Sequence, residues 1–409
     1  MKNRKTFIVM LSILFANILF GQSDTIYYFK QKYDLVGDNI YVFNSGGVER
    51  ENYYGIITNE SNVVDNEKGI WWRKIAKDTG ETIEDIRVKT TQLGVANYHS
   101  SEIIDKGNSV VLSFVENQLT DAGTIMRDIN VLEFNNDGEI EWNKKYGEKN
   151  SDEGSFDLSR TKEGGYIIGG FKTNQETNSP YLIKIDSVGN VEWERIYPTE
   201  IIGAALYVYP TYDGGYIFSG YRGKGNPFAP YYNPYVTRVD SAGNVLWDKV
   251  YYTELNNISS VGVVVPYPNS QNYLFFSYID DINTTPYIMV SKMDDTGELL
   301  WEKSYKFIPP TAGFHTPPQF TSDEGFVIGG HQYNENSKTV VKLFRFTAEG
   351  DTLWTKDYDI EASERQYIRG LLSTSDGGYL LTGLSYEGPV CVGDKNRQFG
   401  QHLLANGLR

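Results

Sequence analysis

The sequence predicts an all-β protein, a seven-bladed β-propeller of four-stranded antiparallel blades. The first observation is a regular spacing of tryptophans, 51, 54, 54 and 53 residues apart from Trp142 to Trp354. The second is that each of these tryptophans follows a short glycine-containing turn, as in S-A-G-N-V-L-W ending at Trp247. The third is the absence of a sustained helical period between runs of strand formers. A period near 50 residues in strand-rich sequence is typical of propeller blades.

The N-terminal segment has the pattern of a secretory signal peptide. Lys2, Arg4 and Lys5 precede an apolar run over residues 7–20, and Gly21 offers a small residue for cleavage. We therefore expect residues 1–22 to be removed and residues 23–409 to form one propeller domain that is secreted or held at the cell surface. The apolar run is too short for a spanning helix, so membrane insertion is not expected.

Composition and net charge limit the classes of partner that the protein is expected to bind. The chain has a formal net charge of −15, and its single cysteine, Cys391, cannot form an intramolecular disulfide. Such an acidic protein repels phosphate backbones and anionic headgroups, which argues against a nucleic-acid partner. Carbohydrate or protein is the expected partner instead.

Residues 204–251 illustrate one predicted blade. Strands are expected at residues 204–211, 216–221, 235–240 and 245–251, with a tight turn at Asp213-Gly214-Gly215, where glycine supplies a positive φ. The signal of the second strand recurs seven times, but the tryptophan strand only six times, counting a looser first copy, E-K-G-I-W-W, that ends at Trp72. The second-strand signals lie near Ile40, Val110, Tyr166, Tyr216, Tyr273, Phe326 and Tyr379.

The missing strand is expected at the N-terminus. Residues 25–33 carry Phe29 and Tyr33 in the register that aromatic and tyrosine residues have in the tryptophan strands. We expect this segment to complete the blade whose first strands lie near residues 367–385, because closing the ring removes an unpaired edge. Residues 388–409 lack strand alternation, although residues 401–405 have a position suitable for the third strand of that blade; a truncated or frame-shifted tail is the alternative.

Five tryptophan strands read aromatic-x-basic-x-Tyr, as in Trp193, Arg195 and Tyr197. Residues two apart on a strand share a face, so these side chains line one side of it. An Asp or Asn seven residues before most of the tryptophans suits a turn that hydrogen-bonds its own backbone. Both patterns are interpreted as scaffold.

The segments K-I-D-S-V-G-N-V-E-W and R-V-D-S-A-G-N-V-L-W resemble the tryptophan-docking repeats of quinoprotein-like propellers. They are more similar still to repeats of secreted bacterial propellers that are often exported by the type IX route. The resemblance covers residues 25 to about 385 and implies a propeller fold. No residues match a quinone or metal site, so no cofactor is expected.

In a four-stranded meander the turns after strands one and three share one face, and the connections after strands two and four share the other. The first set is uniformly short here, whereas the second varies in length, and variable loops on a rigid scaffold are where binding surfaces arise. The run F-A-P-Y-Y-N-P-Y suggests an aromatic platform, and cover for blade edges is the alternative. Candidate ligand-binding residues are Arg222, Phe228, Tyr231, Tyr232, Tyr235, His315 and His331.

No catalytic constellation is recognisable. His315 and His331 lack the companions of a metal site, and no G-x-S-x-G motif is present. The favoured function is a secreted, non-catalytic binding or scaffold propeller that holds a glycan or a protein on its variable-loop face. The alternative is a carbohydrate-active enzyme, with acidic or basic groups near Asp152, Glu153, Glu102 and Arg365 converging at the channel mouth; a structural subunit of a larger secreted assembly is a third hypothesis.

Overall fold

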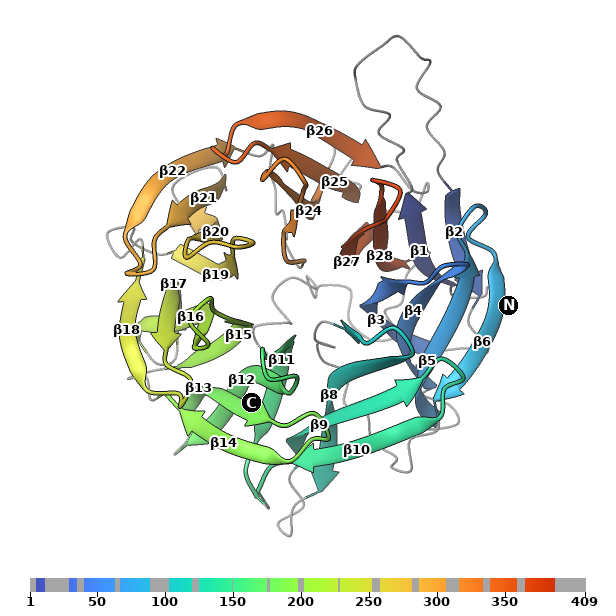
Figure 1. The fold of residues 1–409 in the computed structure, drawn as a ribbon, viewed down its shortest axis with the longest axis horizontal. Coiled ribbons are helices and arrows are strands. Elements are labelled where there is room, and N and C mark those ends of the chain that lie inside the picture. The colour runs from blue at the N-terminus through green and yellow to red at the C-terminus, as the bar shows by residue number, and fades with distance from the viewer. Residues whose placement is uncertain are drawn as a thin grey trace.

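The computed structural model is a ring of antiparallel β-sheets, with the first strand of each sheet nearest the centre and the last at the rim (Figure 1). No helix in the described part of the chain is long and apolar enough to cross a membrane. The described residues are 5–11, 29–34, 40–62, 67–88, 103–119, 125–148, 150–174, 177–197, 202–226, 229–251, 258–281, 287–306, 316–333, 339–358 and 365–386.

The strands follow the chain around the ring. The first three sheets in chain order contain β3 (Ile40–Glu49), β4 (Tyr53–Asn62), β5 (Glu67–Ala76) and β6 (Thr82–Val88); β7 (Ile104–Asp105), β8 (Ser109–Leu119), β9 (Ile125–Asn135) and β10 (Ile140–Tyr146); and β11 (Glu153–Arg160), β12 (Tyr166–Asn174), β13 (Thr177–Ile185) and β14 (Val191–Ile196). The next contains β15 (Gly203–Pro210), β16 (Tyr216–Asn226), β17 (Ala229–Val239), β18 (Val245–Val250), β19 (Ile258–Pro266), β20 (Tyr273–Asp281), β21 (Tyr287–Met293) and β22 (Leu299–Lys306). The last two contain β23 (Gln319–Phe320), β24 (Phe326–Tyr333), β25 (Thr339–Phe346) and β26 (Thr352–Tyr358); and β27 (Arg365–Ser373), β28 (Tyr379–Tyr386), β1 (Lys5–Leu11) and β2 (Phe29–Asp34).

The prediction of seven separate blades is wrong. Counted as hydrogen-bonded sheets, the described strands form a six-bladed propeller with five sheets of four strands and one of eight. A single parallel bridge between Tyr232 of β17 and Ser259 of β19 joins two four-stranded units into the larger sheet. The bridge exists because β17 begins at Ala229, earlier than the predicted start at residue 235, and its first residues reach the neighbouring unit.

The predicted closure by a single N-terminal strand is also wrong. Residues 25–33 were expected as the fourth strand of the closing blade, outside a third strand at residues 401–405, which lie outside the described residues. In the structure β1 takes the third place and pairs with β28, whereas β2 pairs with β1 alone. β1 comes from the segment that the sequence pattern assigns to a signal peptide, because a short apolar run suits a strand as well as an h-region.

Trp72 occupies a different place from the one predicted. It lies on β5, the third strand of its sheet, and β6 is the fourth. Lys74 of β5 pairs with Glu84 of β6. In the third sheet the equivalent lysine, Lys184, pairs with Trp193, so Glu84 occupies the position of the repeated tryptophan. Trp72 is fully buried and lies across Gly55, where an added Cβ would be 1.8 Å from the indole. The 70-residue gap between Trp72 and Trp142 therefore reflects a change of strand within the repeat.

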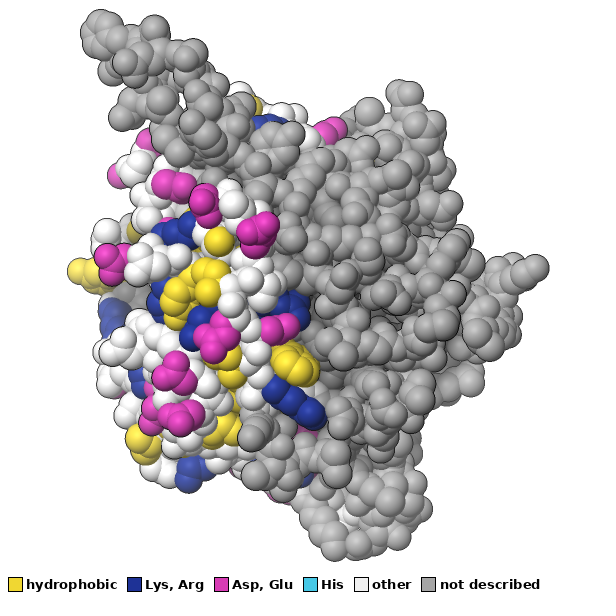
Figure 2. Space-filling model, turned by 90° about the vertical axis from the view of Figure 1, so that its right-hand side faces the viewer, with side chains coloured by type: hydrophobic (Ala, Val, Ile, Leu, Met, Phe, Trp, Pro, Cys, Tyr) yellow, Lys and Arg dark blue, Asp and Glu magenta, His cyan; other side chains and the backbone are white. Residues whose placement is uncertain are grey.

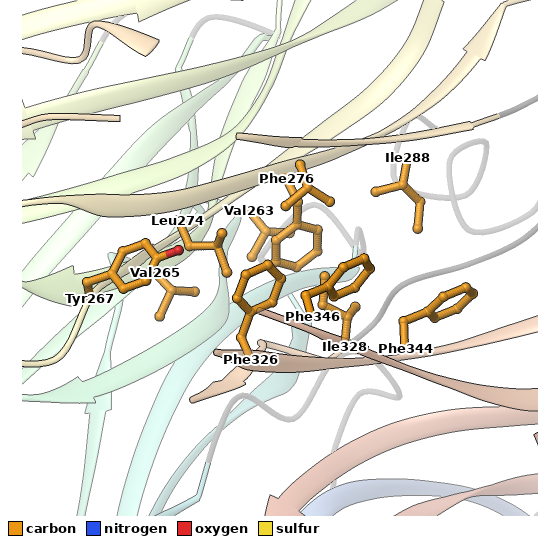
Figure 3. Close-up of a cluster of buried hydrophobic side chains, with 11 residues drawn as sticks. Val263, Val265, Tyr267, Leu274, Phe276, Ile288, Phe326, Ile328, Phe344 and Phe346 are labelled. Atoms are coloured by element: carbon orange, nitrogen blue, oxygen red, sulfur yellow. The ribbon is translucent and has the colours of Figure 1, made fainter. Parts of the chain in front are cut away.

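The core lies between neighbouring sheets. In the cluster of Figure 3, Val263, Leu274 and Phe276 of the eight-stranded sheet face Phe326 and Phe346 of the next sheet. The rings of Phe326 and Phe346 stack with centroids 5.0 Å apart. Burying each such side chain contributes about 1.5–3 kcal/mol, so the contacts between sheets hold the ring together.

The rim is chemically mixed. On the side of the ring that Figure 2 faces, acidic, basic and apolar side chains interleave over the described surface. Leu246, Leu300 and Leu353 occupy equivalent places on β18, β22 and β26, and each is more than half exposed.

Candidate binding surface at the long-loop end

The two ends of the ring are built differently, and we call them the tight-turn end and the long-loop end. At the tight-turn end, Asp240 accepts hydrogen bonds from the backbone N–H groups of Ala242 and Asn244, at 2.9 and 2.8 Å. Asp186 and Asp294 do the same in their own turns, which confirms the predicted role of this position. The glycine that follows has a positive φ, +81° at Gly243, which an L side chain rarely adopts.

Side chains of the outer strand of the preceding unit also donate hydrogen bonds to these turns. The indole Nε1 of Trp247 donates to the carbonyl oxygen of Asp295 in the next turn, at 2.7 Å. The hydroxyl of Tyr251 donates to the carbonyl oxygen of Gly297 in the same turn, at 2.9 Å. Trp193 and Tyr197 make the equivalent bonds to Ser241 and Gly243. The tight-turn end is thus occupied by structural contacts.

The long-loop end carries a first arginine set, formed by Arg127, Asp152 and Phe171. Asp152 accepts three hydrogen bonds from Arg127, from its backbone N–H at 2.9 Å, Nε at 2.8 Å and Nη2 at 2.5 Å. The guanidinium lies over the ring of Phe171, 4.7 Å from its centroid. The ring can lie flat there because its neighbour on β11 is Gly154, where a Cβ would be 2.4 Å from it.

A second arginine set is formed on the neighbouring sheet by Arg222, Asp248 and Tyr235. The carboxylate of Asp248 pairs with Nη1 and Nη2 of Arg222 at 2.5 and 2.8 Å. The guanidinium lies 4.2 Å from the centroid of the Tyr235 ring. Both arginines keep part of their side chain accessible, 21% for Arg127 and 18% for Arg222. Arginine fixed against a ring by a carboxylate is a rigid arrangement, and it leaves further N–H donors for a ligand.

Tyr221 and Tyr232 contact each other in the same region. Their rings meet edge to face with centroids 5.0 Å apart. Burial raises the pKa of Tyr221, and the nearby Tyr232 adds to the rise while Arg127 opposes it. Burial raises the pKa of Tyr232 as well. Both phenols therefore stay protonated at neutral pH and act as neutral hydrogen-bonding groups.

The structure corrects the predicted loop over residues 222–235. Most of it is a long hairpin, because β16 continues to Asn226 and β17 begins at Ala229. Tyr235 is fully buried, with its hydroxyl donating to the carbonyl oxygen of Ala204, so it belongs to the core. Tyr232 is 9% exposed, and it also is mostly buried.

The remaining candidates are less well defined. Tyr231 lies on β17, but its side chain is outside the described part, as are Phe228 and His315 entirely. His331 lies on β24 and not in a loop, with its backbone opposite Val341. Among the described residues of the predicted set, the structure brings together Arg222 and Tyr235, whereas the register of the hairpin places Tyr232 on its other face.

Sequence reasoning missed Arg127 and Phe171. One signal points to this region: a charged residue lies at the seventh or eighth position of the second strand in consecutive sheets, as Glu116, Lys172 and Arg222, whereas the seventh position is Ile279 in the regular unit that follows. Within the described part of the chain, no group of three or more His, Cys, Asp or Glu side chains is placed to hold a metal ion.

No protein-family model matches the chain, and neither does any curated protein. Solved structures of similar shape include Sqt1 from Chaetomium thermophilum, with 11% identity, coverage of 85% of this chain and 96% of that one, and a TM-score of 0.48. A mutant of the Synechocystis apocarotenoid oxygenase has 12% identity, coverage of 77% and 71%, and a TM-score of 0.46. A protein of unknown function from Dyadobacter fermentans has 10% identity, coverage of 85% and 95%, and a TM-score of 0.44. At these values the similarities carry no information on ligand or activity.

Proposed function

We propose that this protein is a secreted, non-catalytic binding propeller that holds a glycan or a protein partner on its long-loop end. One observation carries the proposal: the arginine sets of Arg127 and Arg222 interrupt the repeat on neighbouring sheets at that end. The opposite end is filled by repeated turn contacts that serve the fold.

The chemistry of these sets suits recognition. Arginine and aromatic side chains are enriched where proteins bind partners, because they combine apolar area with directed hydrogen bonds. Here the carboxylates of Asp152 and Asp248 already fix the guanidinium groups. A ligand would therefore lose little free energy in ordering them.

The alternative of a carbohydrate-active enzyme has less support. A glycosidase needs two carboxyl groups that face the scissile bond. Asp152 accepts three hydrogen bonds from Arg127, and the Glu153 side chain is 0% exposed and paired with Lys172. Neither carboxyl group is free to reach a substrate in this arrangement.

Export is part of the proposal and is supported by the sequence pattern of residues 1–22. Cleavage there would remove β1 from between β2 and β28. N-terminal sequencing of protein recovered from the culture medium tests this point. A first residue at Lys2 or Met1 in the exported protein would contradict cleavage.

Binding is tested with the full chain on a glycan array and by affinity capture from the medium of the producing cells. We expect Arg127→Ala and Arg222→Ala each to lower the affinity for any captured ligand at least tenfold. Arg195→Ala is the matched control, because Arg195 also lies over an aromatic ring, that of Trp193, but on the exposed rim. Binding that survives both arginine changes, or that is lost equally in the control, would reject the proposed surface.

A further inference from the structure

Among the described residues, six charged side chains lie near the long-loop end at the interface between the β7–β10 sheet and the β11–β14 sheet. The first sheet contributes Glu116, Asp128 and Lys145; Lys145 Nζ lies 2.5 Å from Asp128 Oδ2 and 3.7 Å from Glu116 Oε2. Asn130 donates to Glu116 from the same sheet at 3.3 Å.

The second sheet and the segment before it contribute Glu148, Glu153 and Lys172. Lys172 Nζ lies 2.9 Å from Glu148 Oε1 and 3.1 Å from Glu153 Oε1, and it also lies over the ring of Tyr181. Ser151 is a further hydrogen-bonding partner of Glu153. These groups, with those of the first sheet, are the titratable and charged side chains that the described elements place around Glu153.

Among the described side chains of this cluster, four carboxyl groups lie near two lysines. Three of these carboxyl groups are buried, with side-chain exposures of 7% for Glu116, 2% for Asp128 and 0% for Glu153. Asp128 and Glu153 crowd the same point beside Gly147. A Cβ added to Gly147 would lie 2.4 Å from Asp128 Oδ1 and 3.2 Å from Glu153 Oε2.

Two carboxylates this close in a buried place do not both ionise readily. Burial raises the pKa of Glu153, and the charge of Asp128 raises it further, while Ser151 and Lys172 oppose the rise. The pKa of Glu153 is therefore raised overall above that of an exposed glutamate.

We propose that Glu153 keeps its proton in the folded protein when exposed glutamates have lost theirs, and that its ionisation at higher pH loosens this interface. The loosening reaches the first arginine set by direct connection, because Arg127 adjoins Asp128 on β9 and Asp152 precedes Glu153 at the start of β11. The same two strand ends that would repel each other are those that the Arg127–Asp152 pair holds together. The effect of Glu153 ionisation on ligand binding rests on the proposed function. Its effect on the interface between the two sheets does not.

The sign of the effect follows from the raised pKa. A carboxyl group whose pKa is higher in the folded chain contributes its stability fully at pH values below the pKa of the unfolded chain. That contribution is lost as the pH rises through the folded value. The expected change is thus a fall in stability as the pH rises above the usual titration range of exposed glutamates, whose pKa is about 4.3.

The test compares the full chain with Glu153→Gln, a neutral side chain of the same shape, and with Glu148→Gln as the control. Glu148 bonds the same lysine but is 71% exposed. In the wild type we expect the infrared absorption of a protonated carboxylic acid to persist above the pH at which exposed glutamates have ionised, and a melting temperature that falls as the pH rises further. Both features should disappear in Glu153→Gln and persist in Glu148→Gln.

A Glu153→Gln protein with the wild-type pH profile, or a wild type without the protonated band, would overturn the proposal. If Glu153→Gln fails to fold, Asp128→Asn serves instead, since removing the neighbouring charge should lower the pKa of Glu153 and move the transition to lower pH, whereas an unmoved transition contradicts the cluster. Hydrogen exchange around Arg127 should increase with ionisation. If the melting temperature depends on pH as expected but the affinity for the ligand does not, only the link between the cluster and ligand binding is rejected.

Discussion

The tight-turn end and the long-loop end of the ring obtain their order from different sources. At the tight-turn end the same backbone bonds recur, with Asp186, Asp240 and Asp294 each capping its own turn. At the long-loop end the contacts differ from sheet to sheet, as the Arg127 and Arg222 sets illustrate. Repetition marks the end that maintains the fold, and irregularity marks the end that is free to acquire a ligand.

The energetic consequence of this difference can be tested. Contacts at the tight-turn end join one sheet to the next and are partly buried, so each should contribute strongly to stability. The Arg127–Asp152 and Arg222–Asp248 pairs at the long-loop end are partly solvated, and partly solvated ion pairs contribute little. Substitutions should therefore separate the two ends by the size of their effect on unfolding.

Trp247→Ala should have the largest effect. It removes the bond to Asp295 and the packing against Gly297, and we expect a loss of about 2–4 kcal/mol in the free energy of unfolding. Leu246→Ala is the control, because Leu246 is the adjacent residue and is 57% exposed. Urea unfolding of both proteins measures the difference, and equal losses would show that the indole does not join the two four-stranded units of the eight-stranded sheet.

Gly297→Ala should have the next largest effect, roughly 2–3 kcal/mol, because it combines a strained backbone with a close approach. Gly297 has a φ of +77°, and an added Cβ would lie 2.9 Å from Trp247. Gly107→Ala isolates the backbone part, since Gly107 has a φ of +84° and nothing within 4 Å of the added atom. The excess loss in Gly297→Ala reports the contact between the two four-stranded units of the eight-stranded sheet, and its absence in denaturation curves would contradict that contact.

The turns of the tight-turn end could be predicted because their chemistry is local. Asp240 and Gly243 lie within one turn, and the sequence alone identifies the residue that caps it and the one with positive φ. The fourth strand after this turn was also predicted correctly to begin at Val245. Trp72 was misplaced because E-K-G-I-W-W shares a glycine and a tryptophan with the repeat but lacks the Asp that forms the turn.

The long-loop end could not be predicted, since its partners are distant in sequence. Arg127 and Asp152 belong to different sheets, and only the packed ring brings them together. The run F-A-P-Y-Y-N-P-Y was expected to lie in the loop between the second and third strands and to form an aromatic platform. Pro234 nevertheless fits β17, where its carbonyl oxygen accepts a bond from the Tyr251 N–H. Proline is compatible with a strand at a place that requires only an acceptor.

Glu133→Gln tests the comparison between the two ends through the pH dependence of stability. Glu133 lies near the tight-turn end and accepts bonds from Lys106, Ser109 and the indole Nε1 of Trp142. Although burial alone would raise the pKa of Glu133, these hydrogen bonds and the charge of Lys106 lower it overall. Its stabilisation is present above the pKa of the unfolded chain and is lost as the pH falls through the folded value.

We therefore expect Glu133→Gln to lose about 1–2 kcal/mol at neutral pH, where the charge-assisted bonds are strongest. The variant should also show a shallower loss of stability on acidification than the wild type. Melting temperatures between about pH 3 and pH 7 measure both quantities. If the melting temperature of the variant falls as steeply on acidification as that of the wild type, Glu133 does not contribute to the acid loss of stability.

Arg127→Ala should have the smallest effect on unfolding and so gives the sharpest test of the difference between the ends. The Arg127–Asp152 pair is about one-fifth exposed on both sides, and such pairs contribute roughly 0–1 kcal/mol. Losing the guanidinium also uncovers one face of Phe171, which water can then reach without a cavity forming. A small loss in denaturation together with a large loss of captured ligand would show that this end serves recognition. A loss comparable with that of Trp247→Ala would mean that the pair is structural and that the two ends do not divide their roles.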